Sequence, residues 1–535
     1  MDDINRLRRF LCTRSERGVC LVKGKQKTVS NLEYDPDDLQ LMQHLTRTMP
    51  AEDLINEIVR YSAVGRLVHP EPVVFALAVC AKTASNMKLR QAAFDALGDV
   101  CMSSTQLFQF LTYCRQLPLS SKDEISKDEN SGWGRAKRRA ISLWYNQKSA
   151  HQLALAVTKC RGRQGWAHID LLRLAHVRPT NEGATLVMKY VTRGLAQVVK
   201  DYANDGLTSE LKEVLQYLRD VELVKHSHDE HQVAMLVEKH QLSFEHIPTW
   251  MRNSAEVWRS LLLHMPLQEL ILSLGKISRV GILSATDTNS MAPTVIERLK
   301  SDITEESNLH PFAILAAQKA YEKGRLEKNR KIDWKPNPAI VESLSTAFCA
   351  SFKNIVPTEK RFLMAVDVSG SMQYGSVNGT YQLKPVQAAA TILMSIARSE
   401  QHYEMLVFSE PMAPAPLNKD MSLQELCHAL GDRQQSSVGT MDCALPIIWA
   451  MELKKDFDVF LLITDCDTLE NTMSPAEALE KYRKVMQKPQ ARFIVIALTS
   501  ANFKLSNYDD PGMLDIAGFD VATVSVMRNF IVGDM

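Results

Sequence analysis

Three oxygen-bearing side chains follow a short apolar run. Residues 362–366 are apolar throughout, and Asp367, Ser369 and Ser371 come next at alternate positions. A carboxylate and two hydroxyls on one tight loop are hard oxygen donors that suit Mg²⁺, which usually takes one or two protein carboxylates and keeps several waters. The spacing therefore predicts a site for one divalent cation, with Mg²⁺ preferred. The competing interpretation is a side-chain-bonded turn that caps the next helix.

Two later residues extend this oxygen set. Asp465 follows a second apolar run, 458–463, and Thr440 lies in a loop before another helix. Ligands of open parallel sheets bind outside the carboxyl ends of the strands. The order Asp-x-Ser-x-Ser, Thr, Asp resembles the metal-ion-dependent adhesion site of von Willebrand factor A domains. The resemblance assigns the metal to Asp367, Ser369, Ser371, Thr440 and Asp465. Such sites usually have Asp directly after the Thr, but Met441 intervenes here, so Asp442 receives no role.

Strand and helix signals alternate around this site. Four apolar runs, each too short for a helix, predict strands near 361–366, 403–408, 458–463 and 491–498. Between the first two, residues 384–398 carry apolar side chains at helical spacing. Short buried strands alternating with helices predict a doubly wound α/β domain over 361–535, of the von Willebrand factor A type. This range holds 21 acidic and 14 basic residues, so by itself it is a poor nucleic-acid platform.

Residues 1–360 carry a different pattern, with almost no strand signal and many amphipathic helical stretches. Two stretches have apolar stripes at helical spacing: Leu54, Ile55, Ile58 and Val59, and Leu211, Val214, Leu215 and Leu218. Pro266 is expected to open a third helix, and Gly275 to end it. Such helices, paired by short polar turns, predict an α-solenoid of HEAT-like repeats over 1–360. No strict repeat period is visible, and a compact helical domain is the alternative.

Positive charge is concentrated in residues 133–200, which we call the basic block. It holds 13 Lys and Arg but only two acidic residues, Asp170 and Glu182, although the whole chain has a net charge of only +1. Like charges repel unless a polyanion neutralises them, so the block predicts contact with nucleic acid. The candidate RNA-binding residues are Arg135, Lys137, Arg138, Arg139, Lys159, Arg161, Arg163, Arg173, His176 and Arg178.

Aromatic residues lie between these cations. Cations at helix ends and turns, flanked by aromatic rings, can follow phosphates and offer planes for unpaired bases. For Trp144 and Trp166, however, a place in the core is the favoured interpretation. His176 is weighed equally as an RNA contact and as an ordinary histidine at a helix end.

The cysteines and the apolar runs indicate the compartment. Ten cysteines are scattered without a Cys-x-x-Cys pair. Most, such as Cys80, Cys101 and Cys349, stand among apolar residues and are expected to be buried, reduced thiols. The arginines near the start are not followed by an apolar core, and no run reaches membrane-spanning length, so neither a signal peptide nor a membrane is expected. We predict a cytoplasmic protein, with the nucleus as an additional compartment.

Several short motifs together resemble the 60-kDa Ro ribonucleoprotein family, in which a TROVE module precedes a von Willebrand factor A domain. They are Gly132 to Arg135, Ala154 to Lys159, Gly165-Trp166, Asp170 to Leu174, Asp442 to Pro446 and Gly512 to Asp515. The resemblance covers nearly the whole chain. It implies a monomer in which HEAT-like helices form a ring closed by the A domain. One departure is the polar, acidic insertion 120–131.

The resemblance also implies partners and their places. The family binds Y RNAs on an outer basic surface and the single-stranded 3′ ends of misfolded small noncoding RNAs in a central hole, in RNA quality control. Carried onto this sequence, Lys159, Arg163 and His176 match basic positions of that RNA-binding surface.

Two other classes of function compete with RNA binding. An intracellular A-domain adaptor would bind an acidic protein ligand through the metal site, but it leaves the basic block unexplained. The other class is an enzyme, such as a metal-dependent nuclease or a partner of an ATPase, and the sequence lacks the motifs that such an enzyme needs. Asp367 and Asp465 belong to one site, there is no second acidic cluster for two-metal chemistry, and no phosphate loop is present. We therefore expect no enzyme.

Overall fold

The computed structural model describes the chain except for residues 16–18, 23–33, 64–69, 84–85, 118–132, 204–205, 304–308, 327–328, 409–411, 416, 433–441, 466–472 and 501–504. Thr440 and the insertion 120–131 therefore lie outside the described residues. By its contacts the chain divides into one unit of residues 28–265 and another of residues 1–27 with 266–535. The domain boundary predicted at 360/361 runs inside the second unit. Closure of the helices into a ring stays a prediction.

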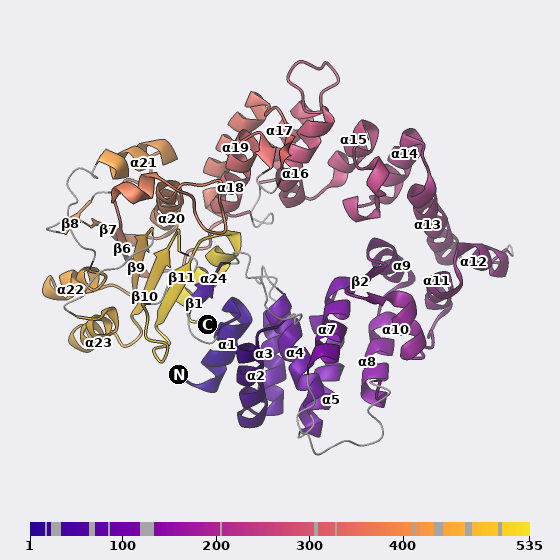
Figure 1. Ribbon diagram of the computed structural model, residues 1–535, viewed down its shortest axis with the longest axis horizontal. Helices are drawn as coiled ribbons and strands as arrows, with labels where there is room; N and C mark the ends of the chain where they lie inside the picture. Colours follow the sequence, from indigo (N-terminus) through magenta and orange to yellow (C-terminus); the bar gives the residue numbers. More distant parts are fainter. Residues whose placement is uncertain are drawn as a thin grey trace. The chain divides into compact units, whose positions relative to one another are not determined.

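The unit of residues 28–265 is helical (Figure 1). Its α-helices are α2 (Pro36–Thr48), α3 (Ala51–Ala63), α4 (Glu71–Lys82), α5 (Met87–Asp95), α6 (Leu97–Val100), α7 (Ser104–Gln116), α8 (Arg135–Asn146), α9 (Ala150–Lys159), α10 (His168–Leu174), α11 (Glu182–Arg193), α12 (Leu195–Asp201), α13 (Ser209–His226), α14 (Glu230–His240) and α15 (Ala255–His264). Two 3₁₀ turns, η2 (Phe244–His246) and η3 (Thr249–Met251), and the short strands β2 (Gly162–Arg163) and β3 (Trp166–Ala167) complete it.

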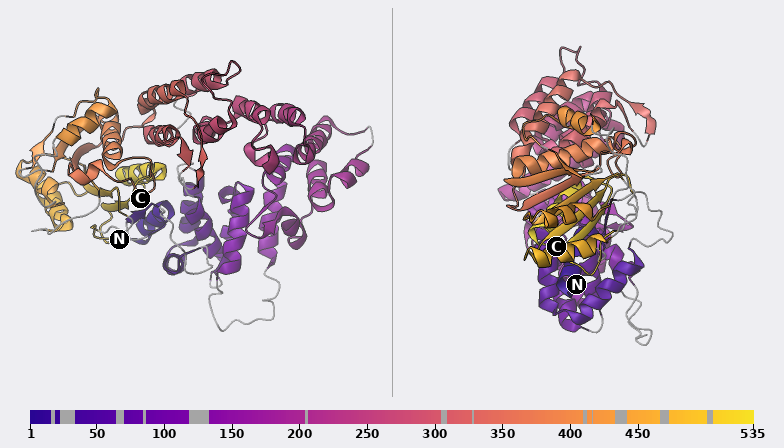
Figure 2. Two further views of the ribbon diagram at one scale, coloured as in Figure 1. Left: turned by 45° about the horizontal axis from the view of Figure 1, so that its top comes forward. Right: turned by 90° about the vertical axis from the view of Figure 1, so that its left-hand side faces the viewer.

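These helices form where local sequence and burial agree. Ser103 with Gln106, and Ser149 with Gln152, form capping boxes that satisfy the first backbone N–H groups of α7 and α9. The predicted stripe on α13 is buried along its length, and in α3 only Val59 of the predicted stripe is not fully buried. Successive helices pack side by side, as α13, α14 and α15 do in Figures 1 and 2. This arrangement confirms the HEAT-like solenoid.

The second unit contains further helices and one large sheet. Its α-helices are α1 (Asp3–Thr13), α16 (Leu267–Val280), α17 (Ala292–Ser301), α18 (Pro311–Glu322), α19 (Pro338–Ser351), α20 (Pro385–Ser399), α21 (Leu423–Asp432), α22 (Leu445–Glu452), α23 (Pro475–Val485) and α24 (Val521–Val532). Short 3₁₀ turns are η5 (Phe352–Asn354) and η6 (Gly370–Gln373), and β4 (Arg325–Leu326) pairs with β5 (Asn329–Asp333).

The prediction for Gly275 was wrong. Pro266 does precede the first turn of α16, but this helix continues through Gly275 and ends at Gly281, whose φ is 97°. A left-handed residue at this point is the usual glycine stop. Gly275 serves packing instead, because a Cβ placed there would lie 2.9 Å from the ring of Trp334.

The sheet has the order β1–β11–β10–β9–β6–β7–β8. Its strands are β1 (Val19–Leu21), β6 (Arg361–Val366), β7 (His402–Val407), β8 (Ala413–Pro414), β9 (Val459–Thr464), β10 (Arg492–Ala497) and β11 (Met513–Ala517). All neighbours are parallel except β7 and β8. Each of the four predicted strands lies within one residue of an observed strand, which confirms the doubly wound α/β domain.

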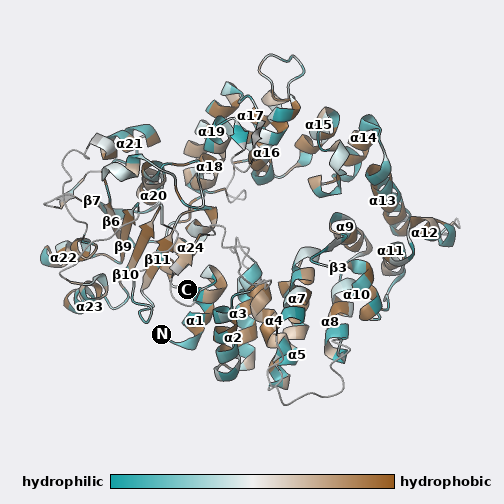
Figure 3. Ribbon diagram, in the orientation of Figure 1, coloured by the Kyte–Doolittle hydropathy of each residue, from teal (hydrophilic) through white to brown (hydrophobic). Residues whose placement is uncertain are grey.

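Helices cover both faces of this sheet. One face packs on α22 and α23 through residues such as Ile447 and Tyr482. Figure 1 shows α20 and α24 on the other side. The central strands β6, β9 and β10 are buried on both faces along nearly their whole length, so they are almost continuously apolar, and β9 and β10 take the hydrophobic colour in Figure 3.

The first strand of the sheet comes from the N-terminal end of the chain. Residues 19–21 form β1, which pairs in parallel with Asp515 to Ala517 of β11. The helix α1 precedes it and carries Arg9, which is fully buried and donates through Nη2 to the carbonyls of Asp510 at 3.1 Å and Met513 at 2.9 Å. The sequence pattern assigned residues 1–360 to the helical part. In the structure, β1 instead belongs to the sheet of the α/β domain, and α1 contacts that domain through Arg9.

The nine described cysteines are free. Cys80 and Cys101 are buried, as expected, and burial raises the pKa of Cys80 to about 12. The expectation for Cys349 was wrong, because this residue is exposed on α19 while Leu344 and Phe348 form the buried face of that helix. Among the described residues, no helix combines the length and apolar composition needed to cross a membrane.

Two buried histidines predict a loss of stability in acid. Burial lowers the pKa of His168 and of His246 from 6.5 to about 4. The unfolded chain therefore takes up these protons first, and stability falls as the pH drops from 6.5 towards 4, by up to about 3 kcal/mol for each histidine. Urea midpoints between pH 7 and pH 5 measure this loss. His246→Gln should make the pH dependence shallower, whereas the exposed His402→Gln should leave it unchanged; an equal slope in all three proteins would contradict the assignment.

Candidate metal centre and nucleic-acid interface

The predicted metal residues lie at the carboxyl ends of two neighbouring parallel strands. Asp367 follows β6 and Asp465 follows β9, and Val366 is in register with Ile463. The strand that follows β6 in the chain, β7, lies on its other side, so the strand order reverses between β6 and β9. This is the position where open α/β sheets bind ligands.

The loop after β6 draws its oxygens together. Asp367 is 5% exposed and accepts from the Ser369 N–H at 2.8 Å and from the Thr464 hydroxyl at 3.2 Å. The hydroxyl oxygens of Ser369 and Ser371 are 2.8 Å apart. The hydrogen bond from the Ser369 N–H to Asp367 forms the side-chain-bonded turn that was the alternative to a metal site. The same turn brings the Asp367 carboxylate and the hydroxyls of Ser369 and Ser371 together at the carboxyl end of β6.

The electrostatics of this edge suit a cation. Burial raises the pKa of Asp367, hydrogen bonds from Ser369 and Thr464 lower it, and the neighbouring carboxylate of Asp465 raises it. Asp465 is itself 7% exposed, so two buried carboxylates repel each other here. A divalent ion would relieve that repulsion, and two carboxylates with two hydroxyls are a donor set that Mg²⁺ accepts. Asp442 accepts from the Ala444 N–H at 2.9 Å, at the start of α22.

The basic block folds into α8 to α12 with a small hairpin between α9 and α10. Arg163 of β2 pairs with Trp166 of β3 across Gln164 and Gly165, whose φ values are 55° and 78°. Two consecutive positive φ angles make the tight turn that favours glycine. The hairpin presents Arg163 to solvent.

His176 lies just past the end of α10. Its φ is 50°, its N–H bonds the Arg173 carbonyl at 3.2 Å, and the next N–H, of Val177, bonds the Leu172 carbonyl at 3.1 Å. This left-handed stop turns the chain after α10. The helix therefore ends at Leu174, and His176 and Arg178 extend from an exposed turn.

Most of the candidate RNA-binding side chains are exposed and without a hydrogen bond or ion pair to a described residue. These are Arg135, Arg139, Arg163, Arg173, His176 and Arg178. They come from α8, the hairpin, α10 and the turn after it. Exposed cations without a protein partner are available to phosphates.

Four of the candidates differ. Lys159 is exposed and 3.9 Å from the Glu245 carboxylate, a weak surface pair. Arg161 donates to Glu222, which also accepts from Tyr190, so this guanidinium stabilises the fold of the block. Lys137 lies 4.6 Å from the centre of the Trp133 ring, and burial lowers its pKa. Arg138 is half-buried.

The tryptophans are explained mainly by packing. Trp144 is fully buried and its indole N–H bonds the Cys101 carbonyl at 2.5 Å, as the favoured interpretation predicted. Trp166 is half-buried, and the guanidinium of Arg115 lies 5.3 Å from its ring centre. Arg115 belongs to α7, about fifty residues earlier, and adds a cation beside the hairpin that the sequence pattern did not indicate.

Comparison with known proteins gives the family. A model of the TROVE domain matches residues 1–322, more than half of the chain, and a model of the Ro60 vWA domain matches residues 361–531. The chain belongs to the Ro60 family.

Individual relatives are similar to this chain over its full length. The chain is 28% identical to the RNA-binding protein RO60 of Caenorhabditis elegans, covering 100% of this chain and 88% of that protein. It is 31% identical to the RNA-binding protein RO60 of Deinococcus radiodurans, covering 100% and 94%. The crystal structure of the Deinococcus radiodurans Ro (RSR) protein matches with a TM-score of 0.86 at 29% identity, with both chains fully covered. The Ro60 fold is therefore shared along the whole chain.

Proposed function

We propose that this protein binds RNA through the exposed cations of its basic block. The observation that carries this proposal is the set of exposed guanidinium groups around the hairpin and the turn after α10 that have no partner among the described residues, in a block with 13 basic and two acidic residues. Membership of the Ro60 family, with relatives named as RNA-binding proteins, supports it. The adaptor alternative leaves this surface without a ligand.

The finer proposal concerns the RNAs and the place of action. Y RNAs and the single-stranded 3′ ends of misfolded small noncoding RNAs are the partners we propose, in a cytoplasmic quality-control role without catalysis. Phosphate contacts give affinity, and unpaired nucleotides give selectivity.

Electrophoretic mobility shifts test both the general proposal of RNA binding and the finer proposal about which RNAs are bound. The protein should retard a stem-loop RNA, and a free 3′ single-stranded tail on a second RNA should strengthen its binding relative to the same RNA with a blunt end. RNA left intact under excess substrate would agree with a binding role. Turnover of the RNA, or absence of any shift at low salt, would contradict the proposal.

We also propose that one divalent cation, preferably Mg²⁺, is held by Asp367, Ser369, Ser371 and Asp465, with Thr440 as the fifth predicted ligand. An open coordination position of such an ion could accept a carboxylate from a protein partner. The donor set described above supports this proposal. The metal residues belong to the acidic α/β domain, whereas the exposed cations of the basic block belong to α8, the hairpin, α10 and the turn after it.

Removing the ion should therefore leave RNA binding intact. Asp367→Ala should abolish Mg²⁺ binding measured by calorimetry, change RNA affinity by less than about twofold, and remove the stabilisation that Mg²⁺ gives to the wild-type protein. Asp420→Ala, an exposed carboxylate of the same domain, is the matched control. If Asp367→Ala or a chelator abolished RNA binding in a folded protein, the ion would be an RNA ligand.

His176 provides a more local test of the RNA surface. His176→Ser should weaken structured-RNA binding by about 3- to 10-fold, the value of one modest hydrogen bond, because this exposed side chain can donate to a phosphate or a base edge. The thermal midpoint should hardly change, since the side chain is exposed. A variant that binds normally but melts at a lower temperature would show that His176 acts only in the turn.

A further inference from the structure

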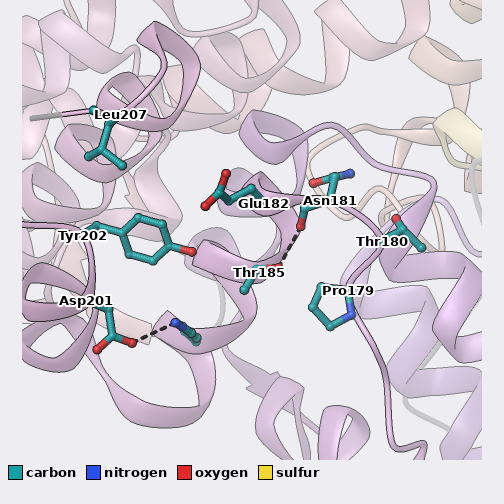
Figure 4. A pocket seen from close by; sticks show the side chains of 10 residues that line it. Pro179, Thr180, Asn181, Glu182, Thr185, Asp201, Tyr202 and Leu207 are labelled. Atoms are coloured by element: carbon teal, nitrogen blue, oxygen red, sulfur yellow. Dashed lines mark hydrogen bonds and ion pairs between the residues drawn. The ribbon is translucent and has the colours of Figure 1, made fainter. Parts of the chain in front are cut away.

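A pocket of about 650 Å³ opens directly after the exposed turn that carries Arg178. It lies within the size range of small-molecule sites, roughly 300–1,000 Å³. Figure 4 shows side chains from α11, from the end of α12 and from the chain before α13 around it. Its lining residues are Pro179, Thr180, Asn181, Glu182, Thr185, Lys189, Asp201, Tyr202, Gly206 and Leu207.

An unpaired carboxylate stands in this pocket although the surrounding sequence is strongly basic. Asp170 and Glu182 are the only acidic residues of the basic block. Asp170 accepts from the Ala167 N–H at 2.9 Å and so stabilises the start of α10. Glu182, by contrast, makes no hydrogen bond or ion pair with a described residue, and its side chain is exposed to the pocket. Such a carboxylate remains available to a ligand.

Most of the other polar groups of the pocket are already paired. Lys189 donates to Asp201 at 2.8 Å, so this pair is nearly neutral, and Thr185 donates to the Asn181 carbonyl at 2.8 Å. Asn181 accepts from the Ala184 N–H at 2.7 Å through Oδ1, which leaves its Nδ2 group as a donor. The pocket thus offers an unused acceptor and an unused donor on adjacent residues, and Figure 4 shows the Glu182 carboxylate extending toward the side of Tyr202 and Leu207.

This combination suits a neutral nucleobase better than a phosphate. The carboxylate of Glu182 would repel a phosphate, but it accepts hydrogen bonds from N–H groups. Guanine is the common base with two adjacent donors on its Watson–Crick edge, N1–H and the N2 amino group, beside the O6 acceptor. The walls add apolar surface from Pro179, Leu207 and the ring of Tyr202, which is 8% exposed.

We propose that this pocket takes an unpaired guanine base of the bound RNA. Glu182 accepts from N1–H and N2, and the exposed Arg178, which directly precedes Pro179 of the pocket, can bind the adjoining phosphate. Unpaired bases are commonly read on this edge by proteins that bind RNA. The inference rests on the proposed function and deepens it, because it adds base selectivity to a surface that otherwise contacts phosphates.

Fluorescence anisotropy with short RNAs tests the pocket in the full-length protein. The probes are an oligouridine with one central guanosine, the same strand with inosine, which lacks the 2-amino group, and plain oligouridine. The wild-type protein should prefer the guanosine strand about 10-fold, as expected for a good bidentate contact. Glu182→Gln should remove that preference. Glu210→Gln, an exposed carboxylate in the first turn of α13, is the matched control and should keep it.

The outcomes separate this inference from the proposed function. A stem-loop RNA that carries no unpaired guanosine is measured in parallel, and Glu182→Gln should bind it as the wild type does. Equal binding of guanosine and inosine strands by the wild type, or an unchanged preference in Glu182→Gln, would overturn the pocket while stem-loop binding persists. If the wild-type protein did not bind the stem-loop RNA at all, the proposed function itself would be overturned.

Discussion

Replacing Lys159 and Arg163 together with alanine is expected to weaken structured-RNA binding by about 10- to 100-fold at low salt. Both side chains are exposed, one at the end of α9 and the other on the hairpin, and neither has a strong protein partner. If each contacts a phosphate, the slope of log affinity against log salt should fall by about 0.7–0.9 for each lost contact. The measurement is a salt titration of binding by both proteins.

A charge-matched control makes this result specific. Lys212→Ala with Arg219→Ala removes the same charge from exposed positions on α13. That variant should lose little affinity, because only long-range attraction changes. Equal losses in the two double variants would show that net charge, and not contact at the hairpin, explains binding. Unchanged affinity and slope in the first variant would remove Lys159 and Arg163 from the interface.

The second large effect is expected at Asp515, where the N-terminal helix and the sheet meet. Its fully buried carboxylate accepts from the backbone N–H groups of Leu505 at 2.7 Å and Ser506 at 2.8 Å, and from the Ser506 hydroxyl at 2.6 Å. Burial raises the pKa of Asp515, and the hydrogen bonds from Ser506 and Leu505, together with the nearby positive charge of Arg9, lower it. Asp515→Ala leaves these three donors without their acceptor and removes a negative charge near the buried guanidinium of Arg9, which should cost about 3–5 kcal/mol.

Native-state hydrogen exchange would locate this loss. Because β1 pairs with Asp515 to Ala517, protection should fall in β1 and β11 together, while α13 in the other unit keeps its protection. Asp509→Ala, an exposed carboxylate nearby, is the matched control and should change neither. If Asp515→Ala were no less stable than that control, the buried carboxylate would not hold the N-terminal segment on the sheet.

Elements whose signals are local could be read from the amino-acid sequence. The strands β6, β9 and β10 were readable because nearly all their residues are apolar and buried on both faces, and the apolar second half of β7 was enough to locate that strand. Asp367 and Asp465 follow the carboxyl ends of β6 and β9. The amphipathic stripe of α13 and the excess of cations in the basic block are also short-range patterns. Family motifs added the overall identity. Thr440, the remaining predicted metal ligand, lies outside the described residues.

Features that depend on partners far apart in the chain became visible only in the folded structure. β1 has three residues and too little pattern to be recognised, and its partner β11 lies almost five hundred residues later. Gly275 resembles a helix stop until the ring of Trp334 fills the space above it. The exposure of Cys349 depends on which face of α19 meets its neighbours. Glu182 is an ordinary first-turn carboxylate until α11 and α12 fold around it, because a pocket is made by packing between segments and leaves no periodic trace in either.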